Sequence, residues 1–144
     1  METLNQVTMI NSTMSTVLWL AAWWALMLVP LVFVRLITSR QQNKIKFDPS
    51  GNDLDGLAAR ITRVTCNNYE NIPLFIGVLL AAQLLGLSEI TDQTACWLLY
   101  ARIGQSLAHL ISGSRNWVLV RFAFYIAQWA LVSCYVVQLL MAVY

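Results

Sequence analysis

The N-terminal quarter of the chain limits the fold more than any other segment. No charged residue occurs between Glu2 and Arg35, and residues 14–34 are nearly all apolar. About 20 consecutive apolar residues cross a bilayer as a helix. A cleaved secretory signal peptide is the alternative, but this run is too long and lacks a basic start. We therefore expect a membrane helix over about residues 13–35.

The composition of the whole chain agrees with a membrane protein. Of its 144 residues, 58% are hydrophobic and 11% are charged, whereas a soluble domain carries about 25% charged residues. This length allows one domain, over residues 1–144. The net charge of +2 is too small for a nucleic-acid-binding protein. Three cysteines without a CxxC pair and a single histidine, His109, do not form an ordinary zinc site.

Three further helices follow, separated by polar and turn-forming segments. The sequence predicts them over about residues 56–87, 94–111 and 117–143. The segment Pro-Ser-Gly-Asn-Asp, which begins at Pro49, is a turn cluster between the first two helices. The predicted fold is therefore an all-α membrane protein with a bundle of four transmembrane helices.

Lysine and arginine are distributed unevenly between the predicted loops. The loop after the first helix holds Arg35, Arg40, Lys44 and Lys46, and the last turn holds Arg115. The N-terminal segment and the link between the second and third helices hold neither residue type. Because basic loops stay in the cytoplasm, we expect both termini on the non-cytoplasmic side, in the lumen or periplasm.

Polar side chains recur at helical spacing in three of the predicted helices. Residues three or four positions apart share one helix face, so each set forms a stripe. The stripes are Arg60, Arg63, Asn67 and Glu70; Arg102, Gln105 and His109; and Arg121, Tyr125 and Gln128. All three stripes lie in the cytoplasmic half of their helices. Since ionisable groups inside a span are candidates for function, we expect one shared site.

Glu70 and Arg102 are predicted at a similar depth in the membrane. Each lies roughly 15 Å from the cytoplasmic end of its helix, at 1.5 Å per residue. An unpaired buried charge is costly, so we expect a structural ion pair between them. The remaining arginines, Arg60, Arg63 and Arg121, then indicate an anionic ligand, best a carboxylate that a guanidinium group binds through two hydrogen bonds. The alternative is that these arginines extend to lipid headgroups.

The polar stripe of the second helix resembles a known family signature. Arg63, Asn67, Glu70 and Pro73 follow the spacing of the MAPEG superfamily, the membrane-associated proteins in eicosanoid and glutathione metabolism. That signature reads Arg, three residues, Asn, two residues, Glu, two residues, Pro. The chain length, the basic first loop and the Ala-Arg pair that ends at Arg102 are also similar, so the resemblance covers essentially the full chain.

The resemblance implies a homotrimer that holds glutathione between neighbouring subunits, in the cytoplasmic half of the membrane. It implies that Arg121, near the start of the fourth helix, stabilises the glutathione thiolate and is the catalytic residue. Arg115 is the alternative, because the length of the preceding loop leaves this alignment open. The residues implied to bind glutathione are Arg40, Arg63, Asn67, Glu70, Gln105, His109 and Tyr125.

The expected protein is similar to the microsomal glutathione transferases. Its glutathione thiolate attacks a hydrophobic electrophile or reduces a lipid hydroperoxide that arrives from the membrane lipid. No metal is expected to take part, and the membrane is either the bacterial inner membrane or the endoplasmic reticulum. The first alternative is a non-enzymatic family member that binds and presents a lipid. A small drug/proton antiporter is the second, but it needs an unpaired membrane carboxylate.

Overall fold

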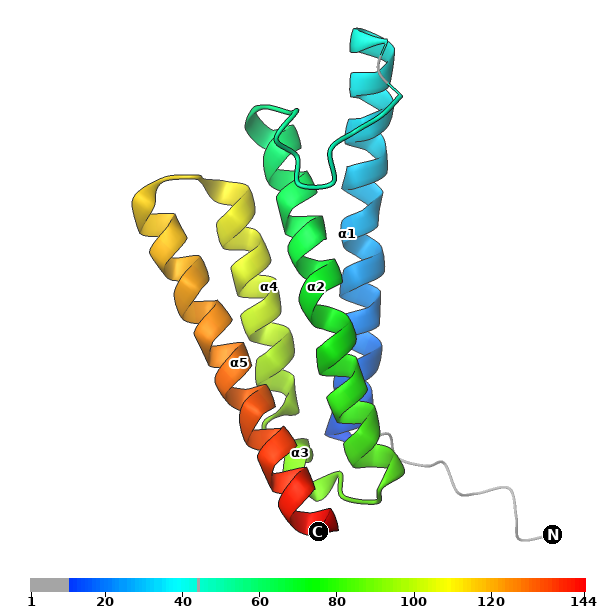
Figure 1. Ribbon diagram of the computed structural model, residues 1–144, viewed down its shortest axis with the longest axis vertical. Coiled ribbons are helices and arrows are strands. Elements are labelled where there is room, and N and C mark those ends of the chain that lie inside the picture. Colours follow the sequence, from blue (N-terminus) through cyan, green and yellow to red (C-terminus); the bar gives the residue numbers. More distant parts are fainter. Residues whose placement is uncertain (1–10, 44) are drawn as a thin grey trace, which may run out of the picture.

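The computed structural model describes residues 11–43 and 45–144, and the regular secondary structure of this part of the chain is all helix (Figure 1). Its helices are α1 (Ser12–Gln42), α2 (Gly56–Leu84), α3 (Glu89–Asp92), α4 (Ala95–Ile111) and α5 (Arg115–Val143). The all-α prediction is therefore confirmed. Lys44 of the predicted basic loop lies outside the described residues, as do Glu2 and the rest of residues 1–10.

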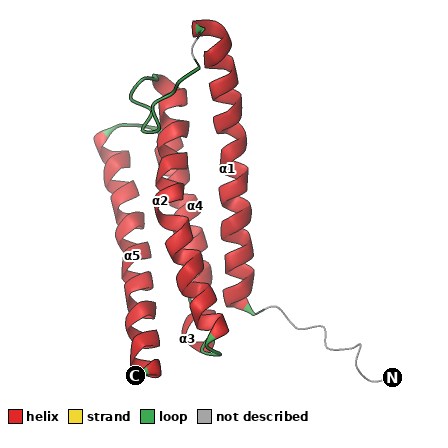
Figure 2. Cartoon of the chain, turned by 45° about the vertical axis from the view of Figure 1, so that its right-hand side comes forward, coloured by secondary structure: helices red, strands yellow, loops and turns green. Residues whose placement is uncertain are grey.

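The four long helices of the described chain run up and down beside one another (Figures 1 and 2). The start of α1, the end of α5 and the short helix α3 lie at one end of the bundle. The segment between α1 and α2 and the turn between α4 and α5 lie at the opposite end. Helix α1 packs against α2 and α4, and α4 packs against α5. We call the end that holds α3 the α3 end, and the other the loop end.

Within the described residues, α1 and α5 are the helices long and apolar enough to cross a membrane. In both, fewer than a quarter of the residues in the most apolar stretch are buried in the isolated chain, as expected for helices that contact lipid or another subunit. Helix α4 has only 17 residues, and α2 carries charged residues in its first half. These features support a helical membrane protein.

Two helix ends differ from the predicted ones. Helix α1 continues to Gln42, well beyond the predicted end near residue 35. It ends at Asn43, whose N–H still donates to the Ser39 carbonyl but whose left-handed backbone (φ 50°) turns the chain out of the helix. Helix α2 ends at Leu84 rather than near residue 87, because Gly86 takes φ 71° and turns the chain into α3.

The hydrophobic core lies towards the α3 end of the bundle. It is built around Leu20 of α1, Phe75 and Leu79 of α2, Leu98 of α4 and Tyr135 of α5, all nearly or fully buried. The polar stripes are nearer the loop end, so the apolar core leaves that half of the bundle to the polar residues.

The start of α1 is tied to α3 by hydrogen bonds. Asp92 Oδ1 accepts from the Thr13 backbone N–H at 2.9 Å and from the Thr13 hydroxyl at 2.5 Å. Asn11 Oδ1 accepts from the Met14 N–H at 2.9 Å. The first N–H groups of a helix lack partners within the helix, so one is capped locally and one by a residue far along the chain.

Candidate functional site

A cavity of about 320 Å³ opens beside α2, in the half of the bundle nearer the loop end. The residues that line it come from α2, from α4 and from the segment before α2. They are Arg63, Cys66, Asn67 and Glu70; His109; and Ser50 and Asn52. The structure thus brings four of the predicted glutathione-binding residues, Arg63, Asn67, Glu70 and His109, to one cavity.

The helical repeat of α2 explains how its side chains reach this cavity. Arg63, Asn67 and Glu70 are four and three residues apart, so they follow one another along one side of the helix. Arg63 and Glu70 are exposed on the isolated chain and Asn67 is half-buried. A cation, an amide and a carboxylate are therefore open to a ligand or to a neighbouring subunit.

The loop before α2, whose sequence predicts only a turn, also contributes residues to the cavity. Asp48 Oδ1 accepts from the Ser50 backbone N–H at 2.8 Å and from the Ser50 hydroxyl at 2.7 Å. Asn52 Nδ2 donates to the same Ser50 hydroxyl at 2.7 Å. These bonds from Ser50 lower the pKa of the Asp48 carboxyl. The loop thereby holds Ser50 and Asn52 at the cavity. Turn-forming residues alone do not indicate that these side chains line a cavity.

Arg102 is fully buried beside the cavity wall. Its Nη1 donates to Asn67 Oδ1 at 2.5 Å and to Gln105 Oε1 at 3.1 Å. The guanidinium carbon lies 5.2 Å from the centroid of the Phe75 ring, a cation–π contact. Within the described residues, Nε and Nη2 of Arg102 have no hydrogen-bond partner.

The predicted ion pair between Glu70 and Arg102 is not formed in the described chain. Glu70 is exposed and accepts a weak bond from the Cys66 thiol at 3.8 Å. Asn67, one turn earlier on α2, takes the guanidinium hydrogen bond instead. Arg102 does join α2 to α4, but through a neutral amide.

Arg121 of α5 lies next to His109 of α4. Its Nη1 is 3.2 Å from His109 Nδ1. Arg121 is half-buried and does not line the cavity, whereas His109 does. In the single chain, Arg121 therefore contacts the imidazole that lines the cavity and not the cavity itself.

Other predicted residues lie away from this cavity. Gln105 is buried behind Arg102. Tyr125 is half-buried on α5, with its ring 6.1 Å from that of Trp129. Arg40 is exposed in the last turn of α1, which projects beyond the other helices at the loop end (Figure 1). Arg115, the alternative to Arg121, is exposed at the first position of α5.

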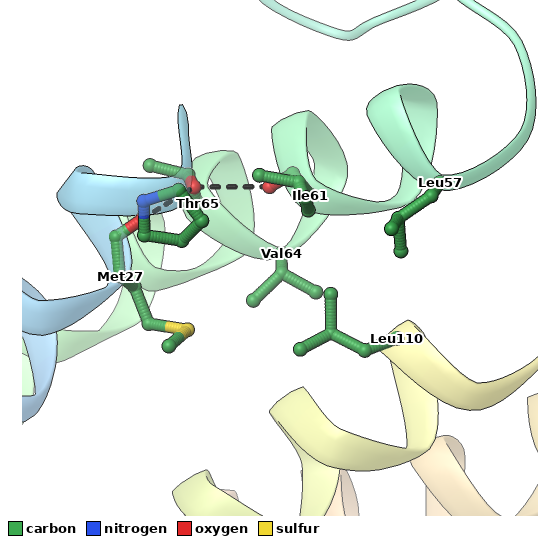
Figure 3. Close-up of a pocket in the computed structure, with 7 residues that line it drawn as sticks. Met27, Leu57, Ile61, Val64, Thr65 and Leu110 are labelled. Atoms are coloured by element: carbon green, nitrogen blue, oxygen red, sulfur yellow. Dashed lines mark hydrogen bonds between the residues drawn. The ribbon is translucent and has the colours of Figure 1, made fainter. Parts of the chain in front are cut away.

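A second cavity, of about 220 Å³, lies between α1, α2 and α4 (Figure 3). Most of its lining is apolar and includes Met27, Ile61, Val64 and Leu110. Its polar group, the Thr65 hydroxyl, donates to the Ile61 carbonyl at 2.9 Å and is 3.4 Å from the Met27 carbonyl. With that hydroxyl already engaged, the second cavity suits an apolar molecule and not a charged one.

We call the first cavity, beside α2, the polar cavity. Its lining differs in chemistry from that of a metal site. In the part of the chain that the structure describes, no group of three or more His, Cys, Asp or Glu residues is placed to hold a metal ion. The cavity instead combines the Arg63 guanidinium group with the Glu70 carboxylate and with neutral polar groups. This combination suits a ligand that carries both carboxylate and ammonium groups.

Comparison with known protein families gives a match over most of the chain. The sequence model of the MAPEG family matches residues 16–141, which include nearly all of the described helices. No curated protein and no solved structure matches the chain.

Proposed function

This chain belongs to the MAPEG family, and on that basis we propose that it is a membrane-bound glutathione transferase or peroxidase. The observation that carries the proposal is the meeting of Arg63, Asn67, Glu70 and His109 at one cavity. The first three also keep the spacing of the family signature along α2.

The groups of the cavity complement those of glutathione. Glutathione carries two carboxylates, one ammonium group and a thiol. Arg63 offers a guanidinium group to a carboxylate, and Glu70 offers a carboxylate to the ammonium group. Asn67 and His109 add neutral polar groups between these charges.

The proposed chemistry depends on the glutathione thiolate, because the thiolate is the nucleophile and the thiol is not. A nearby cation lowers the pKa of a thiol, and Arg121 is the proposed cation, at the His109 edge of the cavity. In conjugation the sulfur forms a C–S bond while the leaving group departs with its electron pair. In peroxidase action two glutathione molecules reduce one hydroperoxide, which gives an alcohol, water and glutathione disulfide.

The proposed assembly is a homotrimer of four-span subunits with both termini on the non-cytoplasmic side. Arg63 and Glu70 are exposed on the isolated chain, and the cavity is open. A neighbouring subunit would cover this side and contribute residues that the single chain holds away from the cavity, such as Arg40. The apolar electrophile or hydroperoxide would then enter from the surrounding lipid, in the bacterial inner membrane or the endoplasmic reticulum.

Calorimetric titration of the detergent-purified protein with glutathione tests the proposal. We expect Arg63→Ala to raise the Kd at least tenfold, about 1.4 kcal/mol, because it removes a carboxylate-binding group. Arg60→Ala is the matched control: it removes the same charge one turn earlier, at a residue that does not line the cavity. An intact wild-type trimer that binds no glutathione would contradict the proposal. Turnover of an aryl halide and of a lipid hydroperoxide then separates conjugation from peroxidase action.

A non-enzymatic, lipid-binding role is the second candidate. The apolar cavity between α1, α2 and α4 favours it, because that cavity suits an apolar molecule (Figure 3). Such a protein would bind a lipid without consuming glutathione. The activity measurement above therefore distinguishes the two candidates.

A further inference from the structure

The hydrogen bond between Arg102 and Asn67 restricts which side of the Asn67 amide faces Arg102. A guanidinium group has five N–H donors and no acceptor, whereas an Asn amide has one accepting oxygen and one donating NH2 group. Since Arg102 Nη1 lies 2.5 Å from Asn67 Oδ1, the oxygen must face the cation. A flipped amide would place two donors against each other and lose a charge-assisted bond.

The Arg102 guanidinium group is itself held by a buried series of hydrogen bonds through the side-chain amides of Gln105 and Gln128. Gln105 Oε1 accepts from Arg102 Nη1 at 3.1 Å and from Gln128 Nε2 at 3.0 Å. Gln128 Nε2 also donates to the Phe124 carbonyl at 2.8 Å. Arg102 and Gln128 are fully buried and Gln105 is nearly so. This series of hydrogen bonds therefore runs from α5 through α4 to the wall of the polar cavity on α2.

Asn67 is one of two hydrogen-bond acceptors that Arg102 has among the described residues. Its Oδ1 is therefore committed to the cation. No group in residues 11–43 and 45–144 accepts a hydrogen bond from Asn67 Nδ2, and Asn67 lines the polar cavity. The NH2 group of Asn67 is therefore the part of the amide that is available to a ligand in the cavity.

We propose that Arg102 is a positioning residue, which orients Asn67 so that the cavity receives an N–H donor and selects an acceptor on the ligand. This rests on the proposed function, in which that acceptor is a carboxylate or carbonyl oxygen of glutathione. Together with Arg63, the oriented amide makes this part of α2 a donor surface. Glu70, three residues further along α2, remains the acceptor of the same wall.

The substitution Asn67→Asp separates this role from a merely structural one. The aspartate keeps an oxygen for Arg102 and adds a negative charge next to the buried cation, so we expect the Tm to stay unchanged or to rise. It replaces the N–H donor with an acceptor, so we expect the Kd for glutathione to rise at least tenfold. Asn67→Ala removes the partner of Arg102 altogether, and its Tm is expected to fall.

Asn67→Leu is the control for added charge, because it removes the N–H donor without placing a carboxylate in the cavity. It leaves Arg102 with Gln105 as its acceptor, so its Tm is expected to fall as in Asn67→Ala. We expect its Kd to rise at least tenfold, as in Asn67→Asp. A Kd within threefold of the wild-type value would show that charge alone accounts for the effect of Asn67→Asp, and would overturn the proposal.

The outcomes distinguish failure of this inference from failure of the proposed function. Unchanged binding by Asn67→Asp, with wild-type binding intact, overturns the donor role of Asn67. A Tm for Asn67→Asp as low as that of Asn67→Ala overturns the orienting bond, and this result requires no glutathione. If the wild-type protein binds no glutathione, the proposed function fails, and the two Tm values alone decide whether Arg102 orients residue 67.

Discussion

Arg121 Nη1 lies 3.2 Å from Nδ1 of His109, and this contact determines the tautomer of the imidazole. Because arginine only donates, Nδ1 must be the acceptor and the ring proton must be on Nε2. We expect 15N NMR of histidine-labelled protein at neutral pH to show an unprotonated Nδ1 and a protonated Nε2. In Arg121→Met the two tautomers should both become populated. A wild-type signal from a protonated Nδ1 would contradict the contact.

The charge of Arg121 should also affect the bound thiol. In Arg121→Met we expect the pKa of glutathione in the complex to rise, because the nearby cation is lost. The thiolate absorbance at neutral pH and the kcat/KM should both fall, the latter by about tenfold or more. Arg121→Lys keeps the charge and should retain part of the activity. Thiolate formation that is unchanged in Arg121→Met would remove Arg121 from the catalytic role.

Gly104 allows α4 and α5 to approach closely. A Cβ atom at this position would lie 2.7 Å from Phe124 Cζ, so Gly104→Ala must displace the ring. We expect a loss of about 1–3 kcal/mol of unfolding free energy, measured by thermal unfolding in detergent. Gly77→Ala is the control, because, apart from the backbone of its own helix, nothing in the described chain lies within 4 Å of its Cβ position. Phe124→Leu in the Gly104→Ala background should restore part of the lost stability.

Asp92 should hold the start of α1. It accepts both the backbone N–H and the hydroxyl of Thr13. The hydroxyl also contacts the Thr91 hydroxyl at 2.7 Å, so in Asp92→Ala the backbone N–H is the donor that loses its partner. We expect a loss of about 1–2 kcal/mol, similar to that of a helix cap, and faster amide exchange at Thr13. Glu89→Ala, at an exposed residue of the same short helix, should leave the exchange rate unchanged.

The loop beside the cavity should respond to pH through Asp48. Hydrogen bonds from Ser50 lower the pKa of this carboxyl in the folded loop. The ionised carboxylate therefore stabilises the folded loop above the pKa of the unfolded chain, and this stabilisation is lost as the pH falls through the pKa of the folded loop. Ser50→Ala removes the hydroxyl donor and keeps the backbone donor. We expect the Asp48 pKa to rise towards its ordinary value in an NMR titration. An Asp48 pKa that does not move would mean that the hydroxyl bond is absent in solution.

The predicted ends of α1 and α2 differ from the observed ones because the end of an apolar run is not where backbone hydrogen bonding stops. The apolar run stops near Arg35, but the following residues still form helix as far as Gln42, where Asn43 provides a left-handed cap. Apolar content marks the edge of the bilayer, whereas helix ends depend on capping geometry. The short helix α3 escaped prediction because four residues carry no periodic pattern.

The candidate site was predictable in part. Helical periodicity placed Arg63, Asn67 and Glu70 along one side of α2, and the structure brings them to one cavity. The partner of Arg102 is not predictable from the sequence, because the number of residues along a helix gives only an approximate depth. Positions 67 and 70 differ by about 4.5 Å in rise, and a small shift between α2 and α4 decides which one meets the guanidinium group. Ser50 and Asn52 depend on how the loop folds back, which no periodicity encodes.

The burial of Arg102 has a consequence for biosynthesis. In the membrane-spanning arrangement proposed above, α4 would be a segment of 17 residues with an arginine near its middle. A central arginine adds about 2.5–3.5 kcal/mol to the free energy of insertion of a single helix. Its acceptors are Asn67, which is made earlier, and Gln105, which Gln128 of the later helix α5 holds in place. Both acceptors are therefore present before α5 is made, so α4 would enter the lipid beside α2 with its arginine already bound to Asn67, and Gln128 would complete the buried hydrogen bonds when α5 follows.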